Sequence, residues 1–220
     1  MKNGNSVGSS LKSPARSAPA KRKKAKVTTA AHDEKRIEII EHCATLFDRV
    51  GYHGTSMQML ADEVGLGKPT LYHYFASKTD ILYEMHQLHI DALIKAMDSH
   101  GADAQPAELL ERACAATLQQ IAQHPGYVRA FMDHYTELQG KQRADMRKRR
   151  AEYFSRLTDI INAGIRTAKF QRVDPELTAL AFVGMCNWAY RWYPRMAQEH
   201  PPEKMAKFLC QLFLNGLNRR

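Results

Sequence analysis

The stretch that most constrains the fold of this chain runs from residue 51 to residue 78 and reads GYHGTSMQMLADEVGLGKPTLYHYFASK. Thr55 and Gln58 lie three residues apart in a capping-box pattern, which predicts that a helix begins there. Gly65 supplies the left-handed backbone conformation with which helices commonly end. Pro69 suits the first turn of a second helix, because its missing N–H is not needed there. The sequence therefore predicts two short helices joined by a tight glycine turn, over about residues 56–75.

The second of these helices carries side chains suited to DNA contacts on its outward face, away from the core. Leu71 and Phe75, four residues apart, are expected to pack inward. The remaining positions offer hydroxyls, an imidazole and a lysine, which can contact phosphates and base edges. A helix-turn-helix places its second helix in the DNA major groove, although such a helix pair taken alone is more often simple packing. The candidate DNA-binding residues are Thr55, Ser56, Gly67, Lys68, Pro69, Thr70, Tyr72, His73, Tyr74 and Lys78.

With these positions in view, residues 33–80 resemble the DNA-binding domain of the TetR family of transcriptional regulators. The family pattern is reproduced by Thr55, Leu60-Ala61, Gly65, Lys68, Thr70-Leu71-Tyr72, His73-Tyr74, Phe75 and Ser77-Lys78. The resemblance implies a homodimer that binds a palindromic double-stranded DNA operator, as a repressor that a small-molecule effector releases. Two positions depart from the pattern: Gly67 stands where the family often has Ser or Thr, and Pro69 where it often has Gly or Ala. A hydroxyl and a backbone N–H that would contact phosphate are therefore missing.

Helical periodicity continues along the chain after residue 33 and no stretch alternates as a strand would, so we expect an all-α fold of about nine helices. Residues 1–30 have the composition of a disordered tail, residues 31–80 form the helix-turn-helix domain, and residues 81–100 form a connecting helix. The resemblance implies that residues 101–220 bind the ligand and form the dimer. Within this last domain the expected helices cover residues 106–123, 125–138, 141–168, 174–194 and 201–217.

The net charge of +9 is concentrated at the amino terminus. Residues 1–27 hold eight Lys or Arg and no acidic residue, which leaves 24 basic against 23 acidic residues in the rest of the chain. The body therefore needs evidence of its own for an anionic partner. The basic cluster at residues 21–24 either adds sequence-independent phosphate contacts or keeps a disordered arm in solution, and the sequence favours neither.

The resemblance also implies that the last two long helices pair with those of a second copy in a four-helix bundle. The apolar stripe of the helix at 201–217 is wide for a single packing partner, and small residues in the preceding helix allow close helix approach. The alternative is that these faces belong only to the core of one chain. The candidate interface residues are Leu180, Gly184, Leu209, Leu212, Phe213 and Gly216.

Aromatic and sulfur-containing residues are dense in the second half, where they either line an apolar ligand pocket or simply fill the core. The candidate pocket residues are Phe131, Met132, Tyr135, Arg150, Phe154, Met185, Trp188 and Trp192. The basic run at residues 143–150 and the aromatic segment at 187–193 are similar to the branch of the family that responds to acyl-CoA and controls lipid and sterol breakdown. We therefore expect an acyl-CoA or another small apolar effector, with an aromatic or drug-like ligand as the alternative.

The motifs argue against an enzyme. The glycine-lysine pair before Pro69 looks superficially like a phosphate-binding loop, but Asp62 stands where that loop needs a glycine and Pro69 where it needs Ser or Thr. His86 and His89 lie three residues apart, without a carboxylate on their face to complete a metal site, and residues 133–137 are equally ordinary on a helix. We therefore expect no catalytic residue, no metal and no cofactor.

Composition also bears on the compartment. No apolar run reaches the length of a transmembrane helix, and no apolar segment of a signal peptide follows the basic amino terminus. Four widely spaced cysteines argue against a disulfide framework and against a zinc knuckle. We expect a soluble cytoplasmic protein without membrane contact. A helical interaction module that does not bind DNA is the alternative from another class, but it would not explain the polar residues gathered on one short helix.

Overall fold

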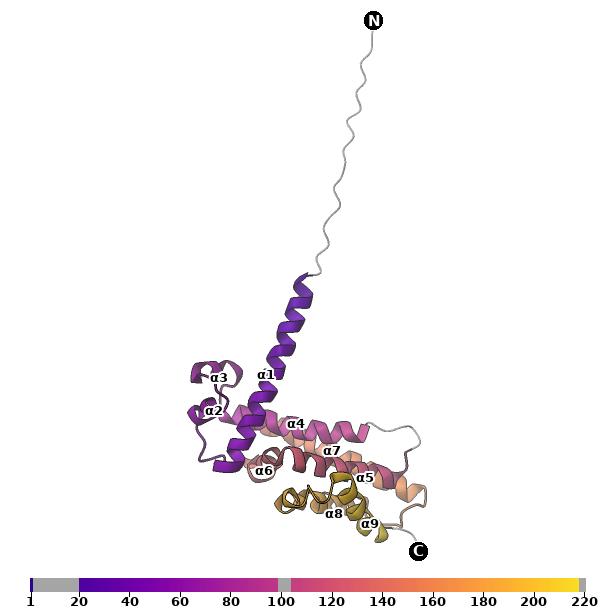
Figure 1. Ribbon diagram of the computed structural model, residues 1–220. Coiled ribbons are helices and arrows are strands. Elements are labelled where there is room, and N and C mark those ends of the chain that lie inside the picture. The colour runs from indigo at the N-terminus through magenta and orange to yellow at the C-terminus, as the bar shows by residue number, and fades with distance from the viewer. Residues whose placement is uncertain (2–19, 99–103, 218–220) are drawn as a thin grey trace. The chain divides into compact units, whose positions relative to one another are not determined.

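The structure is a computed structural model that describes residue 1, residues 20–98 and residues 104–217, with side chains described for residue 1 and from residue 30 onward. Within these residues every regular element is a helix, which confirms the prediction of an all-α fold (Figure 1). The helices are α1 (Ala20–Val50), α2 (Met57–Glu63), α3 (Lys68–Tyr74), α4 (Lys78–Asp98), α5 (Pro106–Gln123), α6 (Pro125–Asp133), α7 (Gly140–Arg166), α8 (Pro175–Trp188) and α9 (Pro202–Asn215). Short 3-10 turns cover Tyr135–Glu137, Ala189–Arg191 and Tyr193–Arg195.

The chain divides into two units, residues 1–37 and residues 38–220. The first unit corrects one expectation, because α1 begins at Ala20, whereas residues 1–30 were expected to be disordered. Its first turns consist of alanine, lysine and arginine, which have high intrinsic helix propensity, so the composition that argued against a core does not prevent a helix. Residues 2–19 of the expected tail lie outside the described residues.

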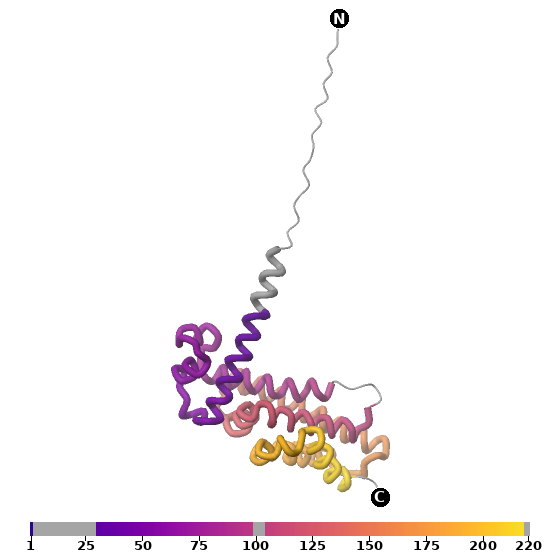
Figure 2. The backbone as a smooth tube through the Cα atoms, viewed as in Figure 1, coloured from indigo at the N-terminus to yellow at the C-terminus, as the bar shows by residue number. Residues whose placement is uncertain are grey.

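In the second unit, α5 is the central element and packs against α4, α6, α7, α8 and α9 (Figure 2). Its buried side chains follow a helical stripe, with Leu110, Cys114, Leu118 and Ile121 all fully buried. The amino end of α6 approaches α1 closely at Gly126, where a Cβ atom would lie 2.4 Å from the carbonyl oxygen of Ala44. Only glycine permits this contact between the two backbones.

The two short helices form where the glycine and proline signals place them, but the cap of α2 differs from the expected one. Ser56 is its N-cap, and its hydroxyl accepts a hydrogen bond from the Met59 N–H at 3.2 Å. The expected partner of the capping box, Gln58, instead donates to Asp62 along the same helix. Gly65 has a φ of +66°, as a left-handed helix end requires.

The later helices follow the expected order, but two of them end earlier than expected. The helix expected over 125–138 stops at Asp133 and is followed by the 3-10 turn Tyr135–Glu137. The helix expected over 174–194 stops at Trp188 and continues as 3-10 turns. Pro194 lacks the backbone N–H that a continuous α-helix would need there, so the helix could not run unbroken to residue 194. The boundary expected at 101–106 falls largely outside the described residues and stays a prediction, although α4 ends at Asp98 and α5 begins at Pro106. In the described part of the chain, no helix is both long and apolar enough to cross a membrane.

Candidate DNA-binding surface and ligand cavity

The third helix presents most of the expected DNA-binding residues on one outer surface. Leu71 and Phe75 anchor the helix and are 0% and 1% exposed. Tyr72 is 46% exposed, and the half-buried Tyr74 lies at the edge of the same surface. The other candidates on and before α3 are exposed: Ser56, Gly67, Lys68, Pro69, Thr70 and His73. The outer face of α3 thus combines hydroxyl, imidazole and ammonium groups, which can reach both phosphates and base edges.

Two of the expected DNA-binding residues have internal roles instead. Thr55 is only 2% exposed, and its hydroxyl donates to the Gly51 carbonyl oxygen at 2.8 Å. The ammonium group of Lys78 donates to the carbonyl oxygens of Tyr52 and Thr55, at 2.9 and 3.0 Å. It also lies 4.4 Å from the centre of the Tyr52 ring. Both residues therefore fasten the loop before α2 to the start of α4, which the local sequence pattern does not reveal.

The same loop contacts the turn after α6. The Tyr52 ring lies 5.3 Å from the ring of His134, and the His53 ring lies 5.7 Å from it. His53 Nε2 is 3.3 Å from Glu137 Oε1. Burial lowers the pKa of His134, and the neighbouring Asp133 carboxylate opposes that shift. The helix-turn-helix is thus joined to the remaining helices through α6 as well as through α4.

A series of polar contacts ties α4 to α7 along its length. The Tyr83 hydroxyl donates to Asp145 at 2.6 Å, and the Gln142 amide donates to Asp80 at 2.7 Å. Further along the helices, two arginines of α7 pair with aspartates of α4. These ion pairs are Arg149–Asp91 and Arg156–Asp98. One member of the basic run at 143–150 is therefore occupied in holding the two helices together.

A cavity of about 280 Å³ lies between α4, α6, α7 and α8. Three of the expected pocket residues line it, namely Phe131, Arg150 and Phe154. The remaining lining residues are His89, Ile90, Leu93, Ala151, Tyr153, Leu180, Val183 and Asn187. Five other expected pocket residues are not part of this lining: Met132, Tyr135, Met185, Trp188 and Trp192. Tyr135 still adjoins the site, because the Arg150 guanidinium lies 4.5 Å from the centre of its ring.

Two histidines of α4 were not expected here: His89 lines the cavity, and His86 lies one helical turn before it without being part of the lining. His86 and His89 are 0% and 1% exposed and both pack against Phe131, with ring centres 5.1 and 4.8 Å away. His86 Nδ1 donates to the Leu82 carbonyl oxygen at 2.7 Å, whereas His86 Nε2 and both ring nitrogens of His89 have no hydrogen-bond partner. Burial lowers the pKa of His86 to about 3 and that of His89 to about 4. The Gln120 side chain partly opposes the lowering of the His89 pKa, although no hydrogen bond of normal geometry joins the two side chains.

At neutral pH the cavity is therefore lined by the uncharged imidazole of His89, whose two ring nitrogens can both hydrogen-bond to a ligand. The spacing of His86 and His89 on the inner stripe of α4 could have identified them as buried residues. The position of His89 beside a cavity depends on α6 and α8, which lie far away in the sequence.

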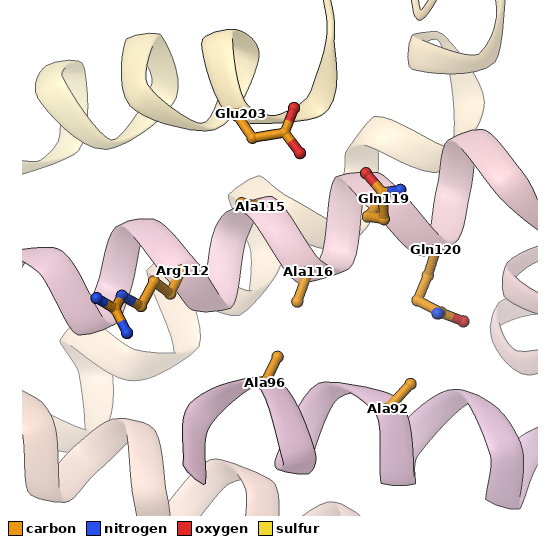
Figure 3. A pocket seen from close by; sticks show the side chains of 8 residues that line it. All are labelled: Ala92, Ala96, Arg112, Ala115, Ala116, Gln119, Gln120 and Glu203. Carbon is orange, nitrogen blue, oxygen red and sulfur yellow. The ribbon is translucent and has the colours of Figure 1, made fainter. Parts of the chain in front are cut away.

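A second cavity, of about 370 Å³, lies between α4, α5 and α9. In Figure 3 the small side chains of Ala92 and Ala96 on α4 point toward α5, and Glu203 reaches in from α9. Arg112, Gln119 and Gln120 complete its polar lining. None of its lining residues is among the buried side chains left without a hydrogen-bond partner, whereas His89 in the first cavity is. The cavity between α4, α6, α7 and α8 is therefore the stronger candidate for a ligand site.

An apolar face formed by α8 and α9 is exposed to solvent. Its large side chains are between 55% and 65% exposed, namely Leu177, Leu180, Trp188, Phe208 and Leu212. Two other candidate interface residues, Gly184 and Gly216, are exposed as well, and a Cβ at Gly184 would meet nothing within 4 Å. The remaining two, Leu209 and Phe213, are half-buried, and the Phe213 ring lies 5.5 Å from that of Phe182. Trp188, expected in the pocket, belongs to this face.

Comparisons with known proteins agree with this arrangement. Residues 39–85 match the family model described as bacterial regulatory proteins of the tetR family, and residues 103–217 match the model for a tetracyclin repressor-like C-terminal domain. The HTH-type transcriptional repressor KstR2 of Mycobacterium tuberculosis is 27% identical over 193 residues, which cover 84% of this chain and 96% of KstR2.

Solved structures show the same fold. The TetR family transcriptional regulator PfmR from Thermus thermophilus is 32% identical with a TM-score of 0.74, covering 82% of this chain and 99% of PfmR. AibR, in a crystal structure with isovaleryl coenzyme A and operator DNA, is 23% identical with a TM-score of 0.70, covering 80% of this chain and 96% of AibR.

The exposed α3 of a helix-turn-helix, followed by a helical domain with its own cavity, defines a DNA-binding transcriptional regulator. Both family models match, and together they extend over most of the described chain. The protein belongs to the TetR family.

Proposed function

We propose that this regulator is a homodimeric repressor that binds a palindromic operator through α3 and leaves it when an acyl-CoA occupies the cavity between α4, α6, α7 and α8. The observation that carries the proposal is the position of this cavity. His89, buried and without hydrogen-bond partners, lines it from α4, the helix that begins at Lys78 directly beyond α3. A ligand there contacts the same helix that supports the DNA-binding surface.

The exposed apolar face supports the homodimer. Five large apolar side chains at more than half exposure on two adjacent helices form a surface that monomeric proteins rarely leave uncovered. A second copy would cover it through a two-fold axis, with each face meeting its own equivalent. A single helix-turn-helix also reads few base pairs, and a dimer binds both halves of a palindrome.

The cavity and its surroundings support an amphipathic effector with an anionic end. A volume of about 280 Å³ holds a short acyl group but not coenzyme A itself. Arg143, Arg147, Arg150 and Phe154 follow one stripe of α7, and the two outer arginines lie over the Tyr135 ring at 6.0 and 4.5 Å. Arginine is well suited to bind phosphate groups. This stripe would hold the phosphates outside while the acyl group lies inside, and the isovaleryl coenzyme A in the AibR structure supports this ligand class.

A second candidate function differs only in the effector. Phe131, Tyr153 and Phe154 supply aromatic walls to the cavity, which would equally favour a flat aromatic or drug-like ligand. Such a ligand would not need the arginine stripe of α7. In either case the regulator would act in the cytoplasm, where operator DNA is accessible.

The two candidates are separated by titration on the full-length protein. An operator selected from random duplexes is bound to the protein, and isovaleryl-CoA, coenzyme A, isovalerate and a planar aromatic cation are added in turn. We expect isovaleryl-CoA to release the DNA at lower concentration than either of its parts. Arg147→Gln should weaken that release several-fold, whereas Lys169→Gln, a change of an exposed cation elsewhere, should not. Release by the aromatic compound alone would favour the second candidate, and release by none would contradict the effector proposal.

A further inference from the structure

A third cavity, of about 280 Å³, lies at the amino end of α6 and shares no lining residue with the effector cavity. It is a pocket open to solvent, lined by residues 41–48 of α1 and by residues 123–127 at the junction of α5 and α6, with Glu41, Thr45 and Gln123 at its exposed rim. All of these residues belong to the same unit of the chain. The close approach of Gly126 to Ala44 fixes the two walls against each other, so neither can move in to fill the space without a backbone clash.

The cavity contains a buried polar group without a partner. Tyr127 lines it and is 4% exposed, and its hydroxyl forms no hydrogen bond. Burial raises the pKa of this phenol, and the Glu41 carboxylate, which lines the same cavity, raises it further. Buried hydroxyls are nearly always hydrogen-bonded in native proteins. The Tyr127 hydroxyl is therefore available to hydrogen-bond to a polar occupant of the cavity.

The charge of the lining is negative. It contains the carboxylates of Glu41 and Asp48 and neither lysine nor arginine. Asp48 is paired with Arg129, at 3.0 Å from Nε to Oδ1, whereas Glu41 forms no ion pair with any described residue. The carboxyl end of α5 and the amino end of α6 meet here, so their opposite helix dipoles largely cancel. The unpaired Glu41 carboxylate therefore gives the cavity lining a net negative charge, which favours a cation.

One wall suits the apolar part of an organic cation. The rings of His124 and Tyr127 are stacked, with centres 4.8 Å apart and an angle of 24° between their planes. Such a pair offers a flat face to methylene groups and attracts a positive charge through its π electrons. A bare metal ion is less suitable, because no group of three His, Cys, Asp or Glu side chains among the described residues is placed to hold one.

We propose that this cavity binds a small primary alkylammonium ion. Its N–H groups donate to the Glu41 carboxylate and to the Tyr127 hydroxyl oxygen, and its methylene groups lie against the stacked rings of His124 and Tyr127. Thr45 and Gln123 provide further oxygen acceptors around the cavity. The site is separate from the effector cavity, although both border α6, since Phe131 of that helix lines the latter.

The test uses n-butylammonium as the probe and full-length protein without DNA, so its result does not depend on the proposed operator or effector. Isothermal titration and thermal melting are measured at constant ionic strength, with sodium chloride replacing the amine salt in the reference. n-Butanol serves as the neutral analogue. We expect saturable binding of butylammonium at millimolar or lower concentration, a raised melting temperature, and no saturable binding of butanol.

Three variants assign the site. Glu41→Gln should weaken butylammonium binding at least tenfold, and Tyr127→Phe, which keeps the stacked ring, should weaken it several-fold. Asp159→Asn removes an exposed carboxylate on α7 and should leave binding unchanged. Each variant's own melting curve shows whether it is folded. Absence of saturable binding, equal binding of butanol, or a Glu41→Gln variant that binds as well as the unchanged protein would overturn the proposal.

Discussion

The third and fourth helices are neighbours in the chain but use their polar side chains in opposite ways. On α3 the polar residues lie outward, as Lys68, Thr70 and Tyr72 show. On α4 several pair with α7, as Tyr83 and Asp91 do, and His89 is buried beside the effector cavity. The exposed polar face of α3 is free to contact DNA in the function proposed above, whereas α4 is fixed by its contacts with α5, α6 and α7 and would transmit a change from the cavity.

A substitution that breaks the proposed dimer should affect DNA binding most, because the dimer brings two α3 helices onto one operator. Leu212 is 58% exposed on α9, so Leu212→Glu should leave the monomer folded and place a charge in the dimer contact. Burying that charge without a partner costs several kcal/mol, about 3 or more, which is over a hundredfold in dimer affinity. Light scattering should show monomers, and operator binding should be lost.

The same substitution at Phe213 distinguishes a residue that lies only in the dimer contact from one that also packs inside the chain. Phe213 packs against Phe182 within the chain, so Phe213→Glu should also lower the melting temperature. A Leu212→Glu protein that remained dimeric would show that the exposed face of α8 and α9 is not the interface.

Lowering the pH should reduce the free energy of unfolding through buried His89 of α4, whereas exposed His73 of α3 should not contribute. Unfolded His89 takes up a proton below about pH 6.5, whereas burial holds its folded pKa at about 4. The unfolded state binds more protons in this interval, so stability is full above about pH 6.5 and falls as the pH falls toward 4, by on the order of 3 kcal/mol. Urea unfolding at several pH values should show a shallower decline for His89→Leu.

The histidine of α3 provides the control. His73 is exposed, so His73→Leu should keep the acid decline of the unchanged protein. Equal declines in all three proteins would mean that His89 is not held neutral by its surroundings.

Lysines on the two helices should differ in their effect on DNA. Lys68→Ala at the start of α3 should weaken operator binding about tenfold and reduce the slope of log affinity against log salt by about one. Lys95→Ala removes an equally exposed charge from α4 and should change neither quantity measurably. Fluorescence anisotropy across a salt series measures both. If the two variants behaved alike, the contribution of Lys68 would be one of net charge only.

The smallest effects come from the same substitution on each helix. Tyr83→Phe removes the hydrogen bond to Asp145 and should lower the free energy of unfolding by about 1 to 2 kcal/mol. Tyr72→Phe removes an exposed hydroxyl and should weaken operator binding by about 1 kcal/mol without altering stability or sequence preference. Paired melting and DNA-binding measurements distinguish them. The contrast between α3 and α4 would be wrong if Tyr72→Phe lowered stability and Tyr83→Phe weakened operator binding alone.

The same contrast explains what could be predicted from the sequence. The outward surface of α3 was predictable because the glycine turn, Pro69 and the inward pair Leu71 and Phe75 are local signals. Thr55 and Lys78 belong to the same motif, but their partners are carbonyl oxygens set by the fold of the loop before α2, which no spacing rule gives.

The ligand cavity was only partly predictable, because it forms where four helices distant in sequence meet. Aromatic content pointed to Phe131 and Phe154, yet it could not separate them from Trp188, which has the same composition signal and lies on the exposed face. The burial of His86 and His89 was not predicted, and it depends on helices distant in sequence, because both rings pack against Phe131 of α6.

The central claim is that a ligand in the cavity moves α3 through α4. It is tested by measuring the distance between spin labels attached at His73→Cys in the two copies of the dimer, with and without isovaleryl-CoA. The four native cysteines are buried, so the exposed new thiol labels selectively. Operator DNA requires the two α3 helices about 34 to 36 Å apart. We expect the bound ligand to shift the labels by several ångström away from their DNA-bound separation. A ligand that raises the melting temperature and releases DNA while the distance distribution stays the same would contradict the claim.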